Sequence, residues 1–206
     1  MDKKLYDLMD WAGIEEIVYS EAADSHKLLG PHITDDGLLI SAFIPTAVMV
    51  TVRLASSGKE FPMELADEAG FFAALIPRKN IPEYTLLVVY DNGTSEELYD
   101  PYAFSPLYTE SDLKKFEAGV HYTIYEKMGA HPMSVNGVEG VYFSVWAPCA
   151  MRVSVVGDFN LWDGRRHQMR RLGDSGIFEL FIPGLASGLI YKYEIKNSHG
   201  EPQLKA

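Results

Sequence analysis

One tryptophan stands in a stretch where a folding chain would normally place only polar residues. Trp162 follows the turn-forming sequence GDFN, and Asp158, Asn160, Asp163 and two arginines surround it. An indole on such a loop offers an amphipathic platform to a partner with an apolar face. A pyranose has such a face, because its axial C–H bonds pack on the ring while its equatorial hydroxyls reach Asn, Asp and Lys side chains. The alternative is that Trp162 folds back and covers the edge of the fold.

The other reactive side chains lack the arrangements that catalysis or metal binding requires. Adjacent glutamates at 15–16 and 96–97 cannot both face one cleft, and the six histidines have no i,i+4 partner and no C-x-x-C neighbour. Motifs for phosphate binding, dinucleotide binding or a nucleophile elbow are absent from the sequence. Cys149 lies in an apolar run, which disfavours the reactive thiolate. We therefore expect no catalytic residue, no metal ligand and no cofactor in this chain.

Composition and charge are those of an ordinary globular protein. Of the 206 residues, 47% are hydrophobic and 23% are charged, which argues against disorder. The net charge of −11 is spread along the chain, so we expect neither a nucleic acid nor an anionic membrane as a partner. A single cysteine excludes an internal disulfide, and no apolar stretch has the length of a signal peptide or a membrane span. We expect a soluble, cytoplasmic protein.

The two halves of the chain carry the same signals in the same order. The matching segments are HKLLGPH at 26–32 with YEKMGAH at 125–131, GLLISAFIPTAVMVTV at 37–52 with GVYFSVWAPCAMRVSV at 140–155, FPMELADEAGFFAALIP at 61–77 with HQMRRLGDSGIFELFIP at 167–183, and YTLLVVYDNG at 84–93 with YKYEIKNSHG at 191–200. The offset rises only from 99 to 107 residues along these four matches. Such ordered self-similarity predicts duplication of one folding unit.

Each half reads as a series of short strands. Residues 38–44 alternate in polarity and end at Pro45, and residues 71–76 form an apolar run that ends at Pro77. Turn residues separate such strands at about ten-residue intervals, which favours an antiparallel sandwich. A parallel α/β fold would need crossover helices, for which the gaps are too short. The predicted fold class is all-β, with two tandem immunoglobulin-like antiparallel β-sandwiches, a short N-terminal helical segment and a short helical linker.

Helical patterns precede each half. Apolar residues recur at helical spacing in 2–11 and 14–21, and Ser111 is the expected N-cap of a helix that ends at Gly119. The predicted organisation is an N-terminal helical segment at 1–25, a first sandwich at 26–105, a helical linker at 106–119 and a second sandwich at 120–206.

Three segments of the second half resemble a known family. They are F-x-V-W-A-P-x-A at 143–150, V-G-D-F-N-x-W-D-G-R at 156–165 and Y-K-Y-E-I at 191–195. Together they resemble the family-48 carbohydrate-binding module that precedes the catalytic barrel of glycogen branching enzymes. DPYAFSP followed by GVHYTIYEKMGAHPM resembles the junction between the two amino-terminal modules of longer bacterial branching enzymes. The resemblance covers essentially the whole chain, more closely after about residue 100 than before it.

The resemblance implies a function and a site. Such enzymes cut an α-1,4-glucan and rejoin the segment through an α-1,6 bond by double displacement, with their nucleophile and acid on a (β/α)₈ barrel that begins just beyond Ala206. Trp162 falls on the sugar-stacking tryptophan of this module family and Lys192 on its hydroxyl-contacting lysine. With Asn160 and Asp163 they form the expected carbohydrate site. The second stacking tryptophan of the family, expected shortly after Gly200, has no counterpart in EPQLKA, and the first half has ASSGKE at 55–60 in place of the motif.

The leading hypothesis is therefore the non-catalytic N-terminal region of a 1,4-α-glucan branching enzyme. Its expected partners are α-1,4-glucan, as glycogen or maltooligosaccharide, and the C-terminal catalytic barrel. Two alternatives stay open. The modules could be purely structural, with no affinity for glucan, or they could belong to a debranching or trehalose-forming relative.

Overall fold

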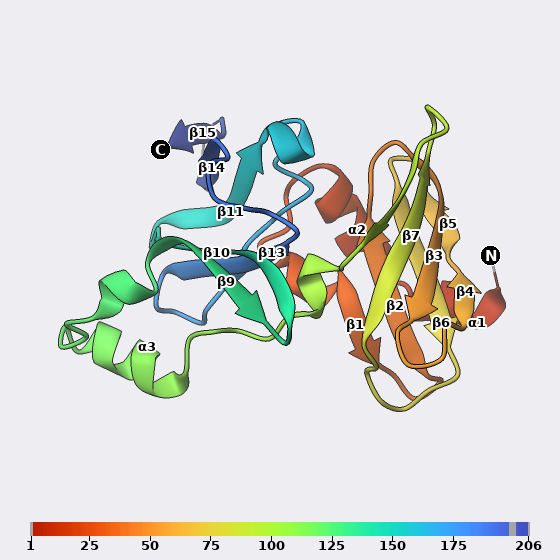
Figure 1. Cartoon of the computed structure of the whole chain (residues 1–206), viewed down its shortest axis with the longest axis horizontal. Helices are drawn as coiled ribbons and strands as arrows, with labels where there is room; N and C mark the ends of the chain where they lie inside the picture. Colours follow the sequence, from red (N-terminus) through yellow and green to blue (C-terminus); the bar gives the residue numbers. More distant parts are fainter. Residues whose placement is uncertain (1, 198–200, 206) are drawn as a thin grey trace. The chain divides into compact units, whose positions relative to one another are not determined.

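The computed structural model describes residues 2–197 and 201–205, and β-strands dominate it (Figure 1). The helices are α1 (Lys3–Leu8), α2 (Trp11–Val18) and α3 (Glu110–Glu117), with 3-10 turns at Ser25–Lys27, Pro101–Ala103, Ile124–Glu126 and Asp158–Asn160. The strands of the first half are β1 (Gly30–Ile33), β2 (Leu38–Phe43), β3 (Ala47–Leu54), β4 (Glu60–Pro62), β5 (Glu64–Asp67), β6 (Phe71–Ile76), β7 (Tyr84–Tyr90) and β8 (Ser95–Leu98). Those of the second half are β9 (Gly129–Val135), β10 (Val138–Trp146), β11 (Ala150–Gly157), β12 (Arg170–Arg171), β13 (Ile177–Pro183), β14 (Tyr191–Asn197) and β15 (Gln203–Lys205).

The chain divides into two compact units. The first comprises Met1–Glu21 with His26–Ala103, and the second comprises Ala22–Ser25 with Phe104–Ala206. The first unit contains sheets β1-β2-β6-β5 and β4-β3-β7-β8, and the second contains sheets β12-β13-β10-β9 and β11-β14-β15. Every pairing between these strands is antiparallel. The prediction of an all-β chain with two sandwiches is confirmed.

The repeat seen in the sequence recurs in the hydrogen bonds. Three bonds of the first unit have an equivalent in the second at the offsets of the sequence match. These pairs are Ile44 N to Gly70 O and Ala147 N to Gly176 O, both 2.8 Å; Met63 N to Val50 O at 2.9 Å and Met169 N to Val153 O at 2.8 Å; and the rings of His32 to Leu29 O at 3.1 Å and of His131 to Met128 O at 2.9 Å. The same β-bulge interrupts β3 at Ala47/Met49 and β11 at Ala150/Arg152. The two units are thus copies of one backbone design.

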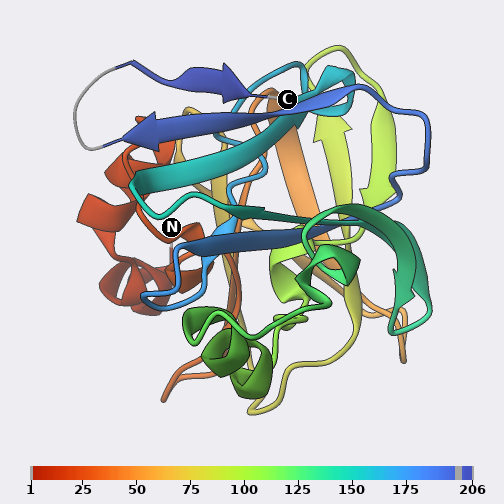
Figure 2. The ribbon, with the colours of Figure 1, turned by 90° about the vertical axis from the view of Figure 1, so that its left-hand side faces the viewer.

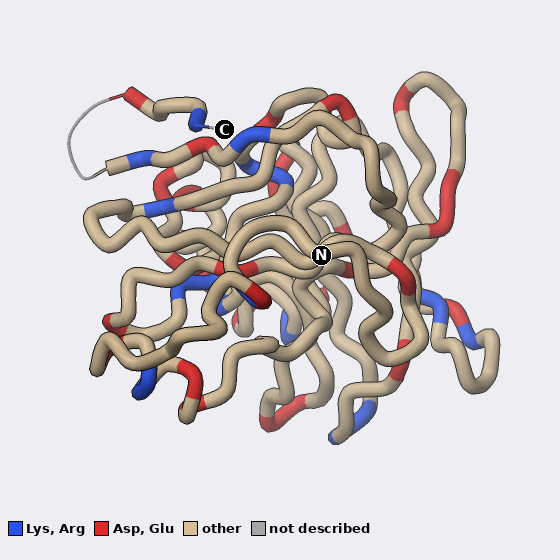
Figure 3. Tube along the Cα trace, turned by 60° about the vertical axis from the view of Figure 1, so that its left-hand side comes forward, with Lys and Arg blue, Asp and Glu red and all other residues tan. Residues whose placement is uncertain are grey.

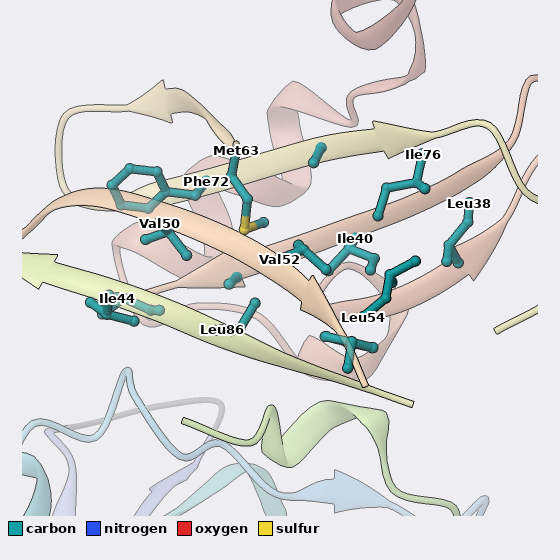
Figure 4. Packing of buried hydrophobic residues seen from close by; sticks show 14 residues of the cluster. Leu38, Ile40, Ile44, Val50, Val52, Leu54, Met63, Phe72, Ile76 and Leu86 are labelled. Atoms are coloured by element: carbon teal, nitrogen blue, oxygen red, sulfur yellow. The ribbon is translucent and has the colours of Figure 1, made fainter. Parts of the chain in front are cut away.

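Alternation along the strands builds the core of the first unit (Figure 4). Side chains at every second position of a strand share a face, and those of β2, β3, β6 and β7 that point between the two sheets are fully buried. The members of this core are Leu38, Ile40, Ala42, Ile44, Val50, Val52, Leu54, Met63, Phe72, Ala74, Ile76, Tyr84, Leu86 and Val88. The bulge removes Val48 from this alternation, and its side chain is exposed.

The second unit has a third layer. Between its sheets lies a core that includes Val153, Val155, Phe178 and Leu180. On the opposite face of β10 and β13, Tyr142 and Phe181 belong to a second hydrophobic cluster. Helix α3 contributes Leu113 and Phe116 to this cluster. Figure 2 shows α3 on the side of β10 and β13 that faces away from β11, β14 and β15. The helix therefore covers the outer face of one sheet.

Helices α2 and α3 begin at residues whose side chains accept hydrogen bonds from free backbone amides. Asp10 accepts a hydrogen bond from Gly13 N at 3.1 Å and starts α2, so the break between α1 and α2 precedes Trp11 instead of following it. Thr109, and not Ser111, caps α3, because Thr109 and Asp112 form a reciprocal capping box. The predicted end of this helix is confirmed, since Gly119 adopts a left-handed φ of 69° after the last turn.

Charged side chains of both signs are interspersed along the trace (Figure 3). In the part of the chain that the structure describes, no helix combines the length and the apolar character needed to cross a membrane.

Candidate functional site

The loop that carries Trp162 is anchored at both of its ends in the second sandwich. It leaves β11 at Gly157 and returns beside the same strand, where Val155 N donates to His167 O at 3.0 Å and Met169 N donates to Val153 O at 2.8 Å. An isolated bridge between Ser154 and Gln168 lies between these bonds. Residues 158–166 therefore form a loop that leaves β11 and returns to it, and the hydrogen bonds at its base hold its two ends together.

Asn160 occupies the interior of this loop. Its side chain is fully buried and accepts from Gly157 N at 3.0 Å through Oδ1. Its Nδ2 donates to Val155 O and to His167 Nδ1, both at 2.8 Å. Both ends of the amide are therefore engaged inside the protein, and none of it faces a ligand. We expected Asn160 to contact sugar hydroxyls; in this geometry it shapes the loop instead.

Trp162 is held in a strained backbone. Leu161 and Trp162 have φ values of 58° and 60°, in the left-handed region that residues with a Cβ rarely adopt. Such a conformation costs on the order of 1–3 kcal/mol per residue and persists only where surrounding contacts enforce it. Here Trp162 N donates to Gly157 O at 2.9 Å, and the indole Nε1 donates to the Asp158 carboxylate at 2.7 Å. Trp162 as a residue is 37% exposed, so its side chain is not buried, and the hydrogen bond to Asp158 restrains the indole.

A buried arginine supports the loop from below. Arg152 lies on the outward face of β11 and is 1% exposed. Its guanidinium donates to Ser154 Oγ at 2.6 Å, to Gly164 O in the loop at 2.9 Å and to Glu194 on β14 at 2.6 Å. A Cβ at Gly164 would lie 2.0 Å from the Glu194 carboxylate, so a larger residue would displace that carboxylate from its place beside Arg152. The loop thus lies against the outer face of the β11–β14 pair.

Lys192 lies on the same face and at the same end of the sheet as the loop. Val156 pairs with Lys192, and the next residue, Gly157, accepts the hydrogen bond from Trp162 N. Strand alternation gives Lys192 the same outward direction as Glu194, which contacts the loop at Gly164. Lys192 is half-buried. Trp162 and Lys192 are therefore attached at the same end of the β11–β14 pair.

Asp163 is engaged by its neighbour Arg165. Its carboxylate accepts from Arg165 N at 3.0 Å and from the guanidinium at 2.8 to 3.2 Å. Burial acts to raise the pKa of Asp163, but the hydrogen bonds from Arg165 outweigh it and hold that pKa below its ordinary value. A carboxylate that stays ionised beside an indole can still accept a hydroxyl on its remaining lone pairs.

His167 is an uncharged component of the loop. Because the Asn160 amide nitrogen can only donate, His167 Nδ1 accepts and carries no proton. Burial and, to a smaller extent, the charge of Arg166 lower the pKa of His167 to about 3, although the charge of Asp163 opposes the change. Sequence reasoning missed the roles of Arg152 and His167, because each depends on a partner that the fold brings to it.

The described residues include side chains of the types that ligate metals and one free thiol. Among residues 2–197 and 201–205, no group of three or more His, Cys, Asp or Glu side chains is arranged to hold a metal ion. Cys149 is exposed in the turn between β10 and β11, and is not enclosed by the apolar run in which it stands. The chain reverses at Pro148 and Cys149, which leaves the thiol exposed.

Comparisons with known families match each unit separately. Residues 10–102 match the family described as alpha-1,4-glucan branching enzyme GlgB, N-terminal domain. Residues 127–206 match carbohydrate-binding module 48, the isoamylase N-terminal domain.

A curated relative aligns with almost the whole chain. The chain is 48% identical over 192 residues to the 1,4-alpha-glucan branching enzyme GlgB of Thermosynechococcus vestitus, an alignment that covers 91% of this chain and 25% of that protein. Among solved structures, a type I pullulanase from Bacillus subtilis complexed with maltose is similar over 85% of this chain and 24% of its own, with 18% identity and a TM-score of 0.31. A pullulanase variant from Paenibacillus barengoltzii complexed with maltotetraose is similar over 65% of this chain and 21% of its own, with 20% identity and a TM-score of 0.34.

Proposed function

Because this chain belongs to the GlgB family of 1,4-alpha-glucan branching enzymes, as their amino-terminal region with a family-48 carbohydrate-binding module, we propose that its second unit binds α-1,4-glucan on Trp162. The observation that carries the proposal is the half-exposed indole, held in a strained loop by its own hydrogen bonds. Strain that surrounding contacts enforce is typical of sites that must present a group in one position.

The neighbouring groups suit a sugar. A pyranose that stacks on the indole of Trp162 would have hydroxyls directed at the ammonium of Lys192 and at the carboxylate of Asp163. Aromatic stacking of this kind contributes about 0.5–1.5 kcal/mol beyond the burial of area. Asn160 acts indirectly, by holding the loop in shape.

The chain spans about a quarter of the length of the curated relative, and the activity of the whole protein is inferred from that relative. We propose that the parent cuts an α-1,4-glucan chain and rejoins it through an α-1,6 bond, by a retaining double displacement on a catalytic barrel. The two units would supply glucan contact and support for that barrel in glycogen synthesis. The proposed modules are 26–105 and 120–206, with helical segments at 1–25 and 106–119. A cytoplasmic location is supported by the single cysteine.

The binding proposal is tested by replacing Trp162. Trp162→Ala should lower the affinity for maltoheptaose by roughly two- to tenfold, in line with the stacking energy. Calorimetry with maltoheptaose and mobility in glycogen-containing gels would measure the change. Trp11→Ala is the matched control, because Trp11 is exposed to the same extent, 36% against 37%, but lies on a helix of the first unit. Unchanged affinity in Trp162→Ala, or the same loss in both variants, would exclude this site and favour a structural role.

The assignment of catalysis has its own test. Retaining cleavage requires two carboxyl groups about 5–5.5 Å apart. The chain alone should therefore form no α-1,6 linkages from amylose, which is followed by iodine absorbance and linkage analysis. Branching by the purified chain would overturn the assignment of catalysis to the barrel.

A further inference from the structure

Another tryptophan of the second unit is more exposed than Trp162. Trp146 is the last residue of β10, paired with Ile177 of β13, and 56% of it is accessible to solvent. Trp11 and Trp162 are 36% and 37% accessible. Trp146 has the same strand parity as Tyr142 and Ser144, which point to the outer face of this sheet. It lies where the cover provided by α3 ends.

The indole of Trp146 is fixed in place. Its Nε1 donates to Ser175 O at 3.2 Å, across the hairpin that leads into β13. The ring of Phe116 on α3 meets it edge to face, at a centroid distance of 6.0 Å and an angle of 71°. A ring held by a hydrogen bond on one side and an aromatic contact on another loses little further freedom when a ligand stacks on it.

The two segments on either side of Trp146 carry exposed aromatic and acidic residues. Because Gly129 pairs with Ser144, the segment that leads into β9 arrives two residues from Trp146 along β10. That segment exposes Tyr122 and Tyr125, which are 83% and 67% accessible. On the other side of β10, Asp174 is exposed next to Ser175, the residue that accepts the indole N–H.

This combination is typical of a site for a polyhydroxylated ligand. The centre of a protein interface is generally depleted in charged residues. Here the exposed Asp174 lies in the hairpin that holds the indole, and charged Lys115 and Glu117 flank Phe116 on α3. Aromatic rings supply stacking surfaces and the charged groups supply partners for hydroxyls.

We propose that Trp146, with Tyr125 and Asp174, forms a second α-glucan-binding platform on this unit. The proposal rests on the glucan-binding function proposed above, and it names a separate surface. Trp162 lies over the outer face of the β11–β14 pair, whereas Trp146 lies on the outer face of the sheet that contains β10. A short oligosaccharide bound flat on one platform does not reach the other. A branched polymer reaches both, which raises its apparent affinity through multivalency.

Indole proton resonances test the proposal directly, because the chain contains only three tryptophans. Spectra of the ¹⁵N-labelled chain should show three indole signals, assigned by Trp11→Phe, Trp146→Phe and Trp162→Phe. Addition of maltoheptaose should shift the signals of Trp146 and Trp162 but leave that of Trp11 in place. The titration is then repeated in Trp162→Ala, where the signal of Trp146 should still shift with the same midpoint.

Each result decides between the two proposals. A shift of Trp162 alone would overturn the second platform and leave the first standing, and a Trp146 shift that vanishes in Trp162→Ala would also overturn it. The absence of any shift would overturn both proposals. A second measurement uses glycogen gels, where Trp146→Ala should weaken retention two- to tenfold and Trp146→Ala with Trp162→Ala should weaken it more than either alone. Trp11→Ala, on a helix of the first unit, is the control and should leave retention unchanged.

Discussion

The two units differ in the length of the connection that follows β3 in the first unit and β11 in the second. After β3 the first unit turns through residues 55–59 and enters β4, with Gly58 N bonded to Leu54 O at 2.8 Å and Leu54 N to Lys59 O at 2.9 Å. At the equivalent position the second unit inserts the longer excursion that carries Trp162, before it returns to β11 at Gln168. The difference teaches that one scaffold acquires a candidate ligand site by lengthening a single hairpin.

The longer loop requires support that the first unit lacks. Met49 of β3 is 52% exposed, whereas its counterpart in β11, Arg152, is 1% exposed and bonded to the loop and to Glu194. Arg53, near the end of β3 in the first unit, instead makes ion pairs with Glu60 and Glu97 at the surface. A polar loop laid on a sheet leaves carbonyl groups beneath it, and a buried arginine satisfies one of them. The support is therefore part of the site.

Exchange of the two loops should produce the largest effect. Replacement of residues 158–165 by the sequence ASSGK of residues 55–59, together with Arg152→Met, gives the second unit the connection of the first. We expect the unit to fold, because the strand pairings on both sides are the same in each copy, and to lose binding at the Trp162 site. Circular dichroism would measure folding and calorimetry would measure affinity for maltoheptaose. Retained affinity would show that the loop does not account for maltoheptaose binding by the second unit.

Removal of the buried cation alone should destabilise the second unit. Arg152→Met, which installs the residue of the first unit, leaves the Glu194 carboxylate and Gly164 O without their partner. Breaking a buried pair in this way costs about 3–5 kcal/mol. Chemical denaturation followed by a probe in the second unit would measure the loss.

Arg53→Met provides the control for that experiment. The ion pairs of Arg53 with Glu60 and Glu97 lie at the surface, where solvent and salt screen them. We expect no measurable change in unfolding. If both variants had the same effect, the burial of Arg152 would not be what distinguishes the two units.

One buried group in each unit should contribute to the free energy of unfolding, and the two contributions should change with pH in opposite directions. Burial raises the pKa of Asp100 in the first unit to about 6 from an ordinary 3.8, against the hydrogen bonds from Tyr84 and Tyr102. Between these values the folded state binds more protons than the unfolded chain, so the contribution of Asp100 falls as pH rises. Burial lowers the pKa of His167 to about 3 from an ordinary 6.5. In that window the unfolded chain binds more protons, so the contribution of His167 is complete above 6.5 and is lost as pH falls toward 3.

Variants isolate these two groups from the other carboxylates. The free energy of unfolding of the native chain minus that of Asp100→Asn should decrease from about pH 4 to 6. The free energy of unfolding of the native chain minus that of His167→Gln should increase from about pH 3 to 6.5. Each difference should change by up to about 1.4 kcal/mol per pH unit. Denaturant unfolding at several pH values measures both. Slopes of the same sign would contradict the opposite effects of burial on an acid and a base.

The smallest effect concerns the polar partner of Trp162. Lys192→Ala removes an ammonium that would contact a sugar hydroxyl at a half-exposed position, where a hydrogen bond contributes about 0.5–1.5 kcal/mol. Maltoheptaose affinity should fall by roughly twofold to tenfold, and no more than in Trp162→Ala. Lys196→Ala, on the same face of β14, is the control and should have no effect. A larger loss than in Trp162→Ala would make charge, and not stacking, the main source of binding.

The amino-acid sequence by itself determined the strands, their duplication and the position of one exposed indole. These features depend on alternation and on turn residues, which act between neighbours in the chain. The shared carbohydrate site of Trp162 and Lys192 stays a prediction from the family resemblance.

Tertiary structure alone decided what lies over each sheet face. Nothing in the spacing of Arg152 distinguishes a surface cation from a buried one, because the loop that covers it must first fold back on the strand. For the same reason Asn160 reads as a ligand contact in the sequence but is buried. Burial of a strand residue is set by elements distant in sequence, and local periodicity carries no information about them.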